Sequence, residues 1–167
     1  TGAGSPVDLQ RKGKVMIDQD FDFHDLFILD LANNHQGSVE HGLKIIQSMA
    51  EVVKHRQVRA AIKFQFRQLD TFIHPSHQSN SELKYIQRFQ STRLDQAQFQ
   101  TLLNEVWAKG LLAMCTPFDE ESVNIAVDMG FNVLKVASCS AKDWPLLEEI
   151  AGAGPPVVCS TGGLTME

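Results

Sequence analysis

The feature of this chain that most constrains its fold is a set of five short apolar runs, each ending in small polar or charged residues. The runs are LFILDLANNH from Leu26, AAIKFQF from Ala60, LLAMCTPF from Leu111, VLKVASCS from Val133 and PVVCSTGG from Pro156. Stretches with helical spacing separate most of these runs. Buried strands that alternate with amphipathic helices are typical of a parallel sheet covered by helices. The sequence therefore predicts an α/β fold.

The apolar runs and the residues between them also predict element boundaries. We expect strands at 26–32, 60–66, 111–116, 133–137 and 157–160, with helices that begin after the capping side chains of Ser38, Asp119 and Asp143. The polar stretch from Arg67 to about Asn80 is long for a connection, and it predicts a functional or mobile loop over the end of the second strand. Two helical stretches follow it, near 81–89 and 95–109.

The number of βα units suggests part of a barrel. A closed (β/α)8 barrel of the TIM type needs about 250 residues, whereas this chain has 167 and shows about five units. We expect residues 26–167 to be the truncated N-terminal part of such a barrel, and residues 1–25 to be a leader or hairpin. Five parallel strands can also form an open doubly wound sheet, and spacing alone leaves both arrangements open.

In either arrangement, ligands bind beyond the carboxyl ends of the strands. The polar residues there form one candidate site: Asp30, Asn33, Asn34, His35, Lys63, Gln65, Thr116, Lys135, Ser138, Ser140, Ser160 and Thr161. Asp30 is expected either to be paired or to hold a substrate hydroxyl. His35 is expected either to be an acid or base or to be a turn histidine bonded to the backbone.

Two lysines stand inside apolar runs, Lys63 in AAIKFQF and Lys135 in VLKVAS. Burying an ammonium group is costly unless an anion neutralises it. The pair therefore favours a bound carboxylate or phosphate, although lysines also extend to solvent along apolar surfaces. Either lysine could instead be a Schiff-base nucleophile. Strand-end hydroxyls at Thr116, Ser138, Ser160 and Thr161 are typical donors to a phosphate, but each is also a common turn residue.

Composition excludes several classes of protein. The formal net charge of −5 does not favour nucleic-acid binding. No apolar run approaches the roughly 20 residues that cross a bilayer. Three cysteines without tight spacing argue against a disulfide framework and against a zinc site, so we expect free thiols in the cytoplasm.

The five strand ends together resemble the N-acetylneuraminate (sialic acid) synthase family. LANNHQGS resembles the family's A-G-x-N-H-x-G, IKFQF its V-K-F-Q-T, MCTPFDEESV its S-T-P-F-D-x-x-S-V and VVCSTGG its I-L-S-T-G-M. LKVASCSAKDWPLLEEIA resembles x-K-I-A-S-x-x-x-x-x-x-P-L-L-x-x-I-A. Each motif alone is weak, but all five occur in the family's order over most of the chain.

The resemblance implies a (β/α)8 barrel and a carbon–carbon bond-forming transferase. Such enzymes condense phosphoenolpyruvate with an acylamino sugar such as N-acetylmannosamine and release phosphate. The resemblance also implies a divalent metal, manganese or magnesium, whose ligands lie beyond Glu167, and a homodimer when the chain is complete. The fragment alone is expected to be inactive.

Carried over residue by residue, the resemblance assigns Lys63 to the phosphoenolpyruvate carboxylate. It assigns Lys135, Thr116, Ser138 and Ser160 to the phosphate, and Gln65 to the sugar. The sugar half departs from the family: Asp30 replaces a glutamate, Phe66 replaces a threonine, and Ser140 stands where an acidic residue is frequent. We therefore expect a different acylamino sugar, such as one leading to a legionaminic- or pseudaminic-type acid. A Schiff-base aldolase or lyase, and a non-catalytic sugar-binding relative, remain alternatives.

Overall fold

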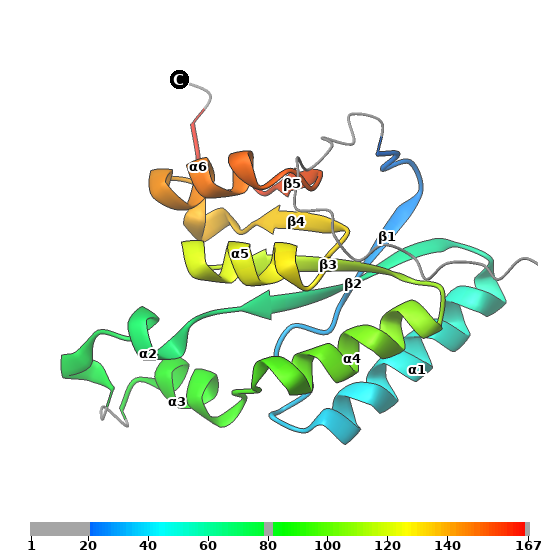
Figure 1. The fold of residues 1–167 in the computed structure, drawn as a ribbon, viewed down its shortest axis with the longest axis horizontal. Coiled ribbons are helices and arrows are strands. Elements are labelled where there is room, and N and C mark those ends of the chain that lie inside the picture. Colours follow the sequence, from blue (N-terminus) through cyan, green and yellow to red (C-terminus); the bar gives the residue numbers. More distant parts are fainter. Residues whose placement is uncertain (1–20, 79–81, 166–167) are drawn as a thin grey trace, which may run out of the picture.

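The computed structural model describes residues 21–78 and 82–165, which form one parallel sheet and its covering helices (Figure 1). The strands are β1 (Leu26–Asp30), β2 (Arg59–Phe66), β3 (Leu112–Pro117), β4 (Val133–Val136) and β5 (Val157–Cys159). The α-helices are α1 (Val39–Arg56), α2 (Leu69–Phe72), α3 (Lys84–Ser91), α4 (Gln96–Ala108), α5 (Glu120–Asp128) and α6 (Trp144–Ala153), with short 3-10 helices η1 (Pro75–His77) and η2 (Ser138–Ser140). All five predicted strands are present, within two residues of their expected ends. No helix in the described ranges is long and apolar enough to cross a membrane.

The strands follow one another across the sheet in chain order, and every neighbouring pair is parallel. A doubly wound sheet reverses its strand order at a switch point, and this sheet does not. Sequential order with helical crossovers is instead the arrangement of a (β/α)8 barrel. The five βα units therefore form part of a barrel, as the sequence predicted.

The two faces of the sheet differ. One face carries alternate apolar residues, among them Ile62, Phe64 and Leu134, and these pack in one cluster with buried residues of α1, α4, α5 and α6. Figure 1 shows α1 beside α4, and α5 near α6. The opposite face, here called the open face, has a small apolar cluster of Ala61, Met114 and Val133. The open face corresponds to the barrel interior.

The predicted helix starts are confirmed by their capping hydrogen bonds. The side chains of Ser38, Asp119 and Asp143 accept hydrogen bonds from backbone N–H groups in the first turns of α1, α5 and α6. Such caps satisfy donors that a helix leaves unpaired at its N-terminus. Because α5 and α6 begin just beyond β3 and β4, these caps also fix the turns that follow the strand ends.

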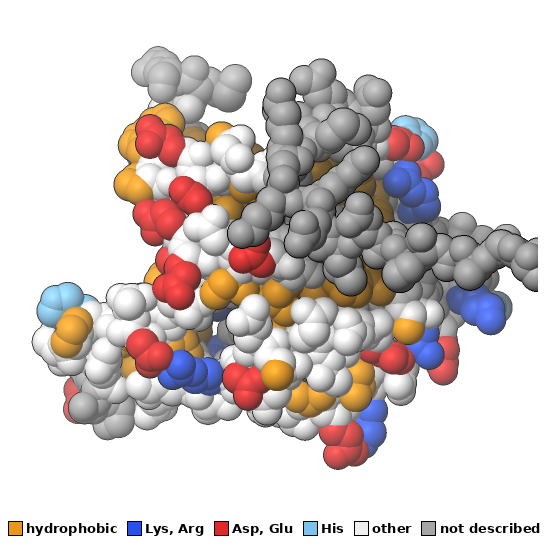
Figure 2. Space-filling model, viewed as in Figure 1, with side chains coloured by type: hydrophobic (Ala, Val, Ile, Leu, Met, Phe, Trp, Pro, Cys, Tyr) orange, Lys and Arg blue, Asp and Glu red, His pale blue; other side chains and the backbone are white. Residues whose placement is uncertain are grey.

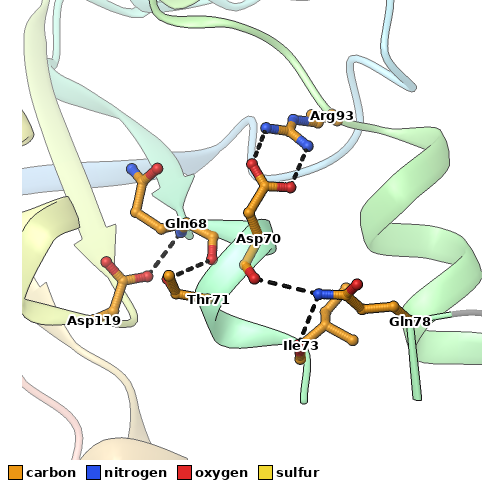
Figure 3. Close-up of polar contacts among 7 residues, drawn as sticks. All are labelled: Gln68, Asp70, Thr71, Ile73, Gln78, Arg93 and Asp119. Atoms are coloured by element: carbon orange, nitrogen blue, oxygen red, sulfur yellow. Dashed lines mark hydrogen bonds and ion pairs between the residues drawn. The ribbon is translucent and has the colours of Figure 1, made fainter. Parts of the chain in front are cut away.

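The polar stretch after β2 is not the loop that the sequence predicted. Residues 67–78 and 82–95, here called the cap segment, include α2, η1 and α3. Arg93 donates two hydrogen bonds to the Asp70 carboxylate, at 2.9 and 2.7 Å, and Gln78 Nε2 donates to two backbone oxygens, those of Asp70 and Ile73 (Figure 3). The Gln68 N–H donates to Asp119 beyond β3 at 2.8 Å. The polar side chains thus bond to one another and to the sheet turns, which orders the segment.

Only part of the expected N-terminal hairpin can be compared with the structure. Residues 15–20 lie outside the described residues, and residues 21–25 form a turn without a strand. In this turn, the Asp22 carboxylate and the His24 carbonyl accept hydrogen bonds from the Arg59 guanidinium, both at 3.1 Å. These contacts tie the turn to the start of β2, at the opposite end of the sheet from the predicted site.

Candidate functional site

The strand register places five predicted site residues on the open face. Asp30 pairs with Lys63 across β1 and β2, and Gln65 pairs with Thr116 across β2 and β3. Paired residues of parallel strands point to the same face, and so do residues two apart in one strand. Lys135 follows Val133 by two residues, and Val133 belongs to the open-face cluster. The open face therefore carries Asp30, Lys63, Gln65, Thr116 and Lys135.

Lys63 forms an ion pair on this face. Its Nζ lies 2.7 Å from Asp30 Oδ1, and the exposed fractions of the two side chains are 9% and 58%. An ammonium group buried to this extent needs an anionic partner, and Asp30 supplies one. The Asp30 side chain is nevertheless more than half exposed. Asp30 is thus paired and also open to the mouth of the partial barrel.

Lys135 is half-buried, and its only hydrogen bond to a described residue is a long one, 3.4 Å, to the Val136 carbonyl. Burial lowers the pKa of Lys135, and the nearby charge of Lys63 lowers it further, while Asp30 acts in the opposite direction. The register sets Lys135 one row beyond Lys63, beside Thr116 and Gln65. Two ammonium groups therefore share a single carboxylate, which leaves this part of the open face positive.

Thr116 adds an unused hydrogen-bonding group. The residue is 2% exposed, and its Oγ1 has no partner within the described ranges. A buried hydroxyl without a partner is costly, so such groups in native proteins usually have a functional or solvent explanation. A ligand oxygen between Thr116 and Lys135 would satisfy both groups.

The turns that follow β4 and β5 lie side by side. The Ser160 N–H donates to the Val136 carbonyl at 3.1 Å, which continues the pairing of the two strands. A Cβ atom added to Gly162 would lie 3.6 Å from the Ser138 Cβ, so the turn after β5 passes directly beside Ser138. Ser138 and Thr161 are exposed, whereas Ser140 is buried within η2.

His35 and Asn34 lie in the turn after β1 and bond to that turn. His35 is 1% exposed, its Nδ1 accepts the Gly37 N–H at 3.1 Å, and its ring packs edge-on against Phe99 of α4. Burial lowers the pKa of His35, with a smaller contribution from His41. Asn34 Nδ2 donates to the Asp30 carbonyl at 3.2 Å. Of the two interpretations left open by the sequence, the structure favours a turn histidine bonded to the backbone, on the helix-covered side.

Arg67, which follows Gln65 by two residues, was not among the predicted site residues. Its guanidinium carbon lies 3.7 Å from the centre of the Phe118 ring and 4.4 Å from that of Phe89, and its Nη2 donates to Gln65 Oε1 at 3.1 Å. The alternation of β2 could have indicated that Arg67 follows Lys63 and Gln65 on one side. The aromatic contacts come from residues 22 and 51 positions away in the chain and have no local signal.

Other features of the described surface lie away from the cluster of Lys63, Thr116 and Lys135. Residues 21–78 and 82–165 contain no group of three histidine, cysteine, aspartate or glutamate side chains that could hold a metal ion. The metal therefore stays a prediction about residues outside these ranges. A cavity of about 810 Å³ lies at the other end of the sheet, between the C-terminal ends of α1 and α4 and the starts of β2 and β3. Acidic side chains gather over α5 and α6 (Figure 2), away from the open face.

The comparisons with known proteins agree on one family. The model of the NeuB family matches residues 48–167. The fold is similar to the crystal structure of a candidate spore coat polysaccharide biosynthesis protein E from Chromobacterium violaceum, with a TM-score of 0.81 and 48% identity over 83% of this chain and 41% of that one. The N-acetylneuraminic acid (sialic acid) synthetase of Leptospira borgpetersenii, crystallised with citrate, gives a TM-score of 0.67 and 26% identity over 85% of this chain and 46% of that one.

A curated relative points the same way. The N,N'-diacetyllegionaminic acid synthase of Campylobacter jejuni is 25% identical over 143 residues, which is 82% of this chain and 42% of that protein. This chain thus spans less than half the length of the relatives named here. The family match covers more than half of the chain, and the fold, the strand order and the motifs agree with it. The chain therefore belongs to the NeuB family, and its relatives include synthases of the sialic acid type.

Proposed function

We propose that the protein containing this chain is a phosphoenolpyruvate-dependent nonulosonic acid synthase. The observation that carries the proposal is the cluster of Lys63, Lys135 and Thr116 on the open face. Two ammonium groups there share one carboxylate, and a buried hydroxyl has no partner among the described residues. Phosphoenolpyruvate carries a carboxylate and a phosphate, and charge-assisted hydrogen bonds from lysine suit both.

The proposed roles follow the positions of the side chains. Lys63 is the residue for the carboxylate, because its ammonium is buried and already oriented by Asp30. Lys135 and Thr116 are the residues for the phosphate, with Ser138 and Ser160 at the adjoining strand ends. An anion beside Lys135 would oppose the effects of burial and of Lys63 on its pKa, so ligand binding and the charged state of Lys135 favour each other.

In the proposed reaction, C3 of phosphoenolpyruvate forms a bond to the aldehyde carbon of the sugar. Water adds at C2, and the C–O bond to phosphate breaks. The residues of this chain would hold phosphoenolpyruvate by its two charged ends and would keep negative charge on the departing phosphate close to Lys135. Asp30 and Gln65 face the same mouth and are placed to contact hydroxyl or amide groups of the sugar.

The names of the relatives support an acylamino sugar as the second substrate. One relative is a diacetyllegionaminic acid synthase, and another is a sialic acid synthetase crystallised with citrate, a carboxylate-rich anion. Asp30 is one methylene shorter than the glutamate that the resemblance implies. We therefore propose an acceptor related to, but different from, N-acetylmannosamine, and we place the protein in the cytoplasm as a homodimer.

The test is phosphate release from phosphoenolpyruvate by the full-length protein, assayed with manganese or magnesium and a panel of acylamino sugars. The expected result is release that depends on one sugar and falls at least tenfold in the Lys135→Ala variant. Folded, metal-loaded protein that binds phosphoenolpyruvate and turns over no sugar would support a non-catalytic relative instead.

One observation favours a second candidate, a Schiff-base aldolase or lyase. Lys135 is half-buried and has a lowered pKa, and a lysine that loses its proton more readily is a better amine nucleophile. Borohydride trapping with pyruvate separates the candidates, because the synthase reaction forms no imine. A stable adduct at Lys135 by mass spectrometry would replace the first proposal with the second.

A further inference from the structure

Arg67 is a cation whose charge is not neutralised by any described carboxylate. Its guanidinium packs against Phe118 and Phe89, with Phe72 at 5.9 Å. No aspartate or glutamate oxygen in the described ranges lies within ion-pair distance of it, and its buried Nε has no described partner. Arg93, another arginine of the cap segment, is already paired with Asp70 (Figure 3).

Burial makes this unpaired charge costly. Desolvation lowers the pKa of Arg67 to about 10, and the nearby Cys139 and Asp119 offset only a part of that effect. The two carboxylate oxygens of Asp119 accept the N–H groups of Ser122 and Gln68, and no ion pair joins Asp119 to Arg67 in the described residues. Burying a cation without a partner is unfavourable, so a partner of opposite charge would stabilise this arrangement.

Arg67 also orients Gln65, which lies on the open face. Because Gln65 Oε1 accepts from Arg67 Nη2, the amide directs its Nε2 donors away from Arg67. A pocket at the ends of β1 and β2 is lined by both residues together with Asn33, Thr92 and Arg93, and no aspartate or glutamate lines it. This pocket therefore presents N–H donors and positive charge, a combination that selects oxyanions.

We propose that Arg67 and Gln65 form a second oxyanion subsite, for a carboxylate or phosphate group, distinct from the subsite of Lys63 and Lys135. The aromatic rings hold the guanidinium plane, so that its edge can donate two parallel hydrogen bonds. Two sources could supply the oxyanion: an acidic group on the second substrate, or the phosphate that the reaction releases. The choice between these sources rests on the proposed function, whereas the existence of the subsite does not.

The first test measures binding without turnover and uses inorganic phosphate as the probe. In the full-length protein, the Nε–Hε NMR resonance of Arg67, assigned by its loss in Arg67→Lys, should shift on titration with phosphate. The shift should persist in Lys135→Ala, because the two subsites are separate. An Arg67 resonance that stays in place at phosphate concentrations that saturate the protein would overturn the proposal, whether or not the protein is a synthase.

The second test compares variants by calorimetry. Arg67→Gln should weaken phosphate binding at this subsite at least tenfold, and Arg67→Lys should weaken it less, since lysine keeps the charge and loses the planar fork. Arg56→Gln, at the exposed end of α1, is the matched control and should bind as the wild type does. Equal phosphate affinities for the wild type and folded Arg67→Gln would refute the subsite. If Arg67→Gln does not fold, the NMR titration of the wild type tests the subsite instead.

The third test identifies the source of the oxyanion by steady-state kinetics. If the second substrate supplies it, Arg67→Gln should raise the KM of acidic acylamino sugars at least tenfold and leave that of neutral ones unchanged. If released phosphate supplies it, the variant should instead weaken product inhibition by phosphate by a similar factor. An active variant with both quantities unchanged would overturn a role for this subsite in the reaction.

Discussion

The sheet and the cap segment each position a basic residue near the same strand ends, but by different means. Lys63 is placed by the register of β2 with its neighbours and is paired with Asp30. Arg67 is placed by the aromatic side chains of Phe89 and Phe118, and it has no carboxylate partner among the described residues. The position of Lys63 depends on backbone hydrogen bonds between strands, whereas the position of Arg67 depends on side-chain packing.

This difference has a consequence for stability. The sheet residues beneath the site, such as Phe64, are fully buried in the cluster that joins four helices. Helices α2 and α3 of the cap segment contain no buried residue, and the Gln68 N–H bonds to Asp119 beyond β3. Regions with few buried apolar contacts open at lower free energy than the core does. We therefore expect the sheet to determine global stability and the cap segment to open separately.

The largest predicted effect tests this expectation in the core. Phe64→Ala should lower the free energy of unfolding by about 3–5 kcal/mol, since it leaves a cavity between Phe99 and Phe131. The matched control is Phe72→Ala, whose ring is 40% exposed in the cap segment. Urea denaturation of both variants should give a loss less than half as large for Phe72→Ala. Equal losses would mean that the cap segment and the sheet unfold as one unit.

The next-largest effect is expected for ligand binding by a lysine of the strands, Lys135. Lys135→Ala should weaken phosphoenolpyruvate binding about 10- to 150-fold, since a hydrogen bond to a charged group contributes roughly 1.5–3 kcal/mol. Unfolding stability should change little, because the Lys135 side chain makes only one long hydrogen bond to the described residues. Calorimetry and urea denaturation of the same preparation provide the check. A loss of stability with unchanged affinity would make Lys135 a structural residue.

A smaller effect is expected at the turn between β1 and α1, which passes beside Ser91 and Thr92 of the cap segment. Burial lowers the pKa of His35 below its usual value of 6.5, so the unfolded chain binds the proton more readily. The contribution of neutral His35 to the free energy of unfolding is complete above pH 6.5 and decreases as the pH falls below that value. His35→Gln should reduce the loss of stability between pH 7.5 and 5.5. The control His41→Gln, at an exposed site, should retain most of the loss, and an unchanged pH profile in His35→Gln would contradict the account.

The smallest effect on global stability is expected in the cap segment. Asp70→Asn removes the exposed ion pair with Arg93, and exposed pairs contribute little to global stability because water and salt screen them. Hydrogen exchange should nevertheless accelerate in residues 69–73, which the pair ties to the start of α4. Glu40→Gln, which breaks another exposed pair, should leave this exchange unchanged. Global destabilisation as large as that of Phe64→Ala would remove the distinction between the two regions.

Much of the sheet could be predicted from the sequence because its signals are local. Apolar runs marked the strands, and the capping side chains of Ser38, Asp119 and Asp143 marked three helix starts. Lysines within apolar runs also indicated an anion-binding site. The placement of Lys135 one row beyond Lys63 was not predictable, because register depends on how strands pair rather than on periodicity within a strand.

The cap segment could not be predicted to the same extent. Its residues 67–80 are polar, and polarity without periodicity predicts a loop. The order comes from contacts between distant residues, such as that of Asp70 with Arg93 and that of Gln68 with Asp119. Arg67 was missed for the same reason, because the aromatic rings that it contacts belong to separate segments of the chain.

The central claim is that Lys63, Thr116 and Lys135 form one anion-binding pocket at the open face. A crystal structure of the full-length protein with phosphoenolpyruvate tests it most directly. The account predicts the phosphate within hydrogen-bonding distance of Lys135 Nζ and Thr116 Oγ1, and the carboxylate at Lys63 Nζ. Phosphoenolpyruvate bound elsewhere, for example in the cavity between the ends of α1 and α4, with these three side chains free of it, would contradict the account.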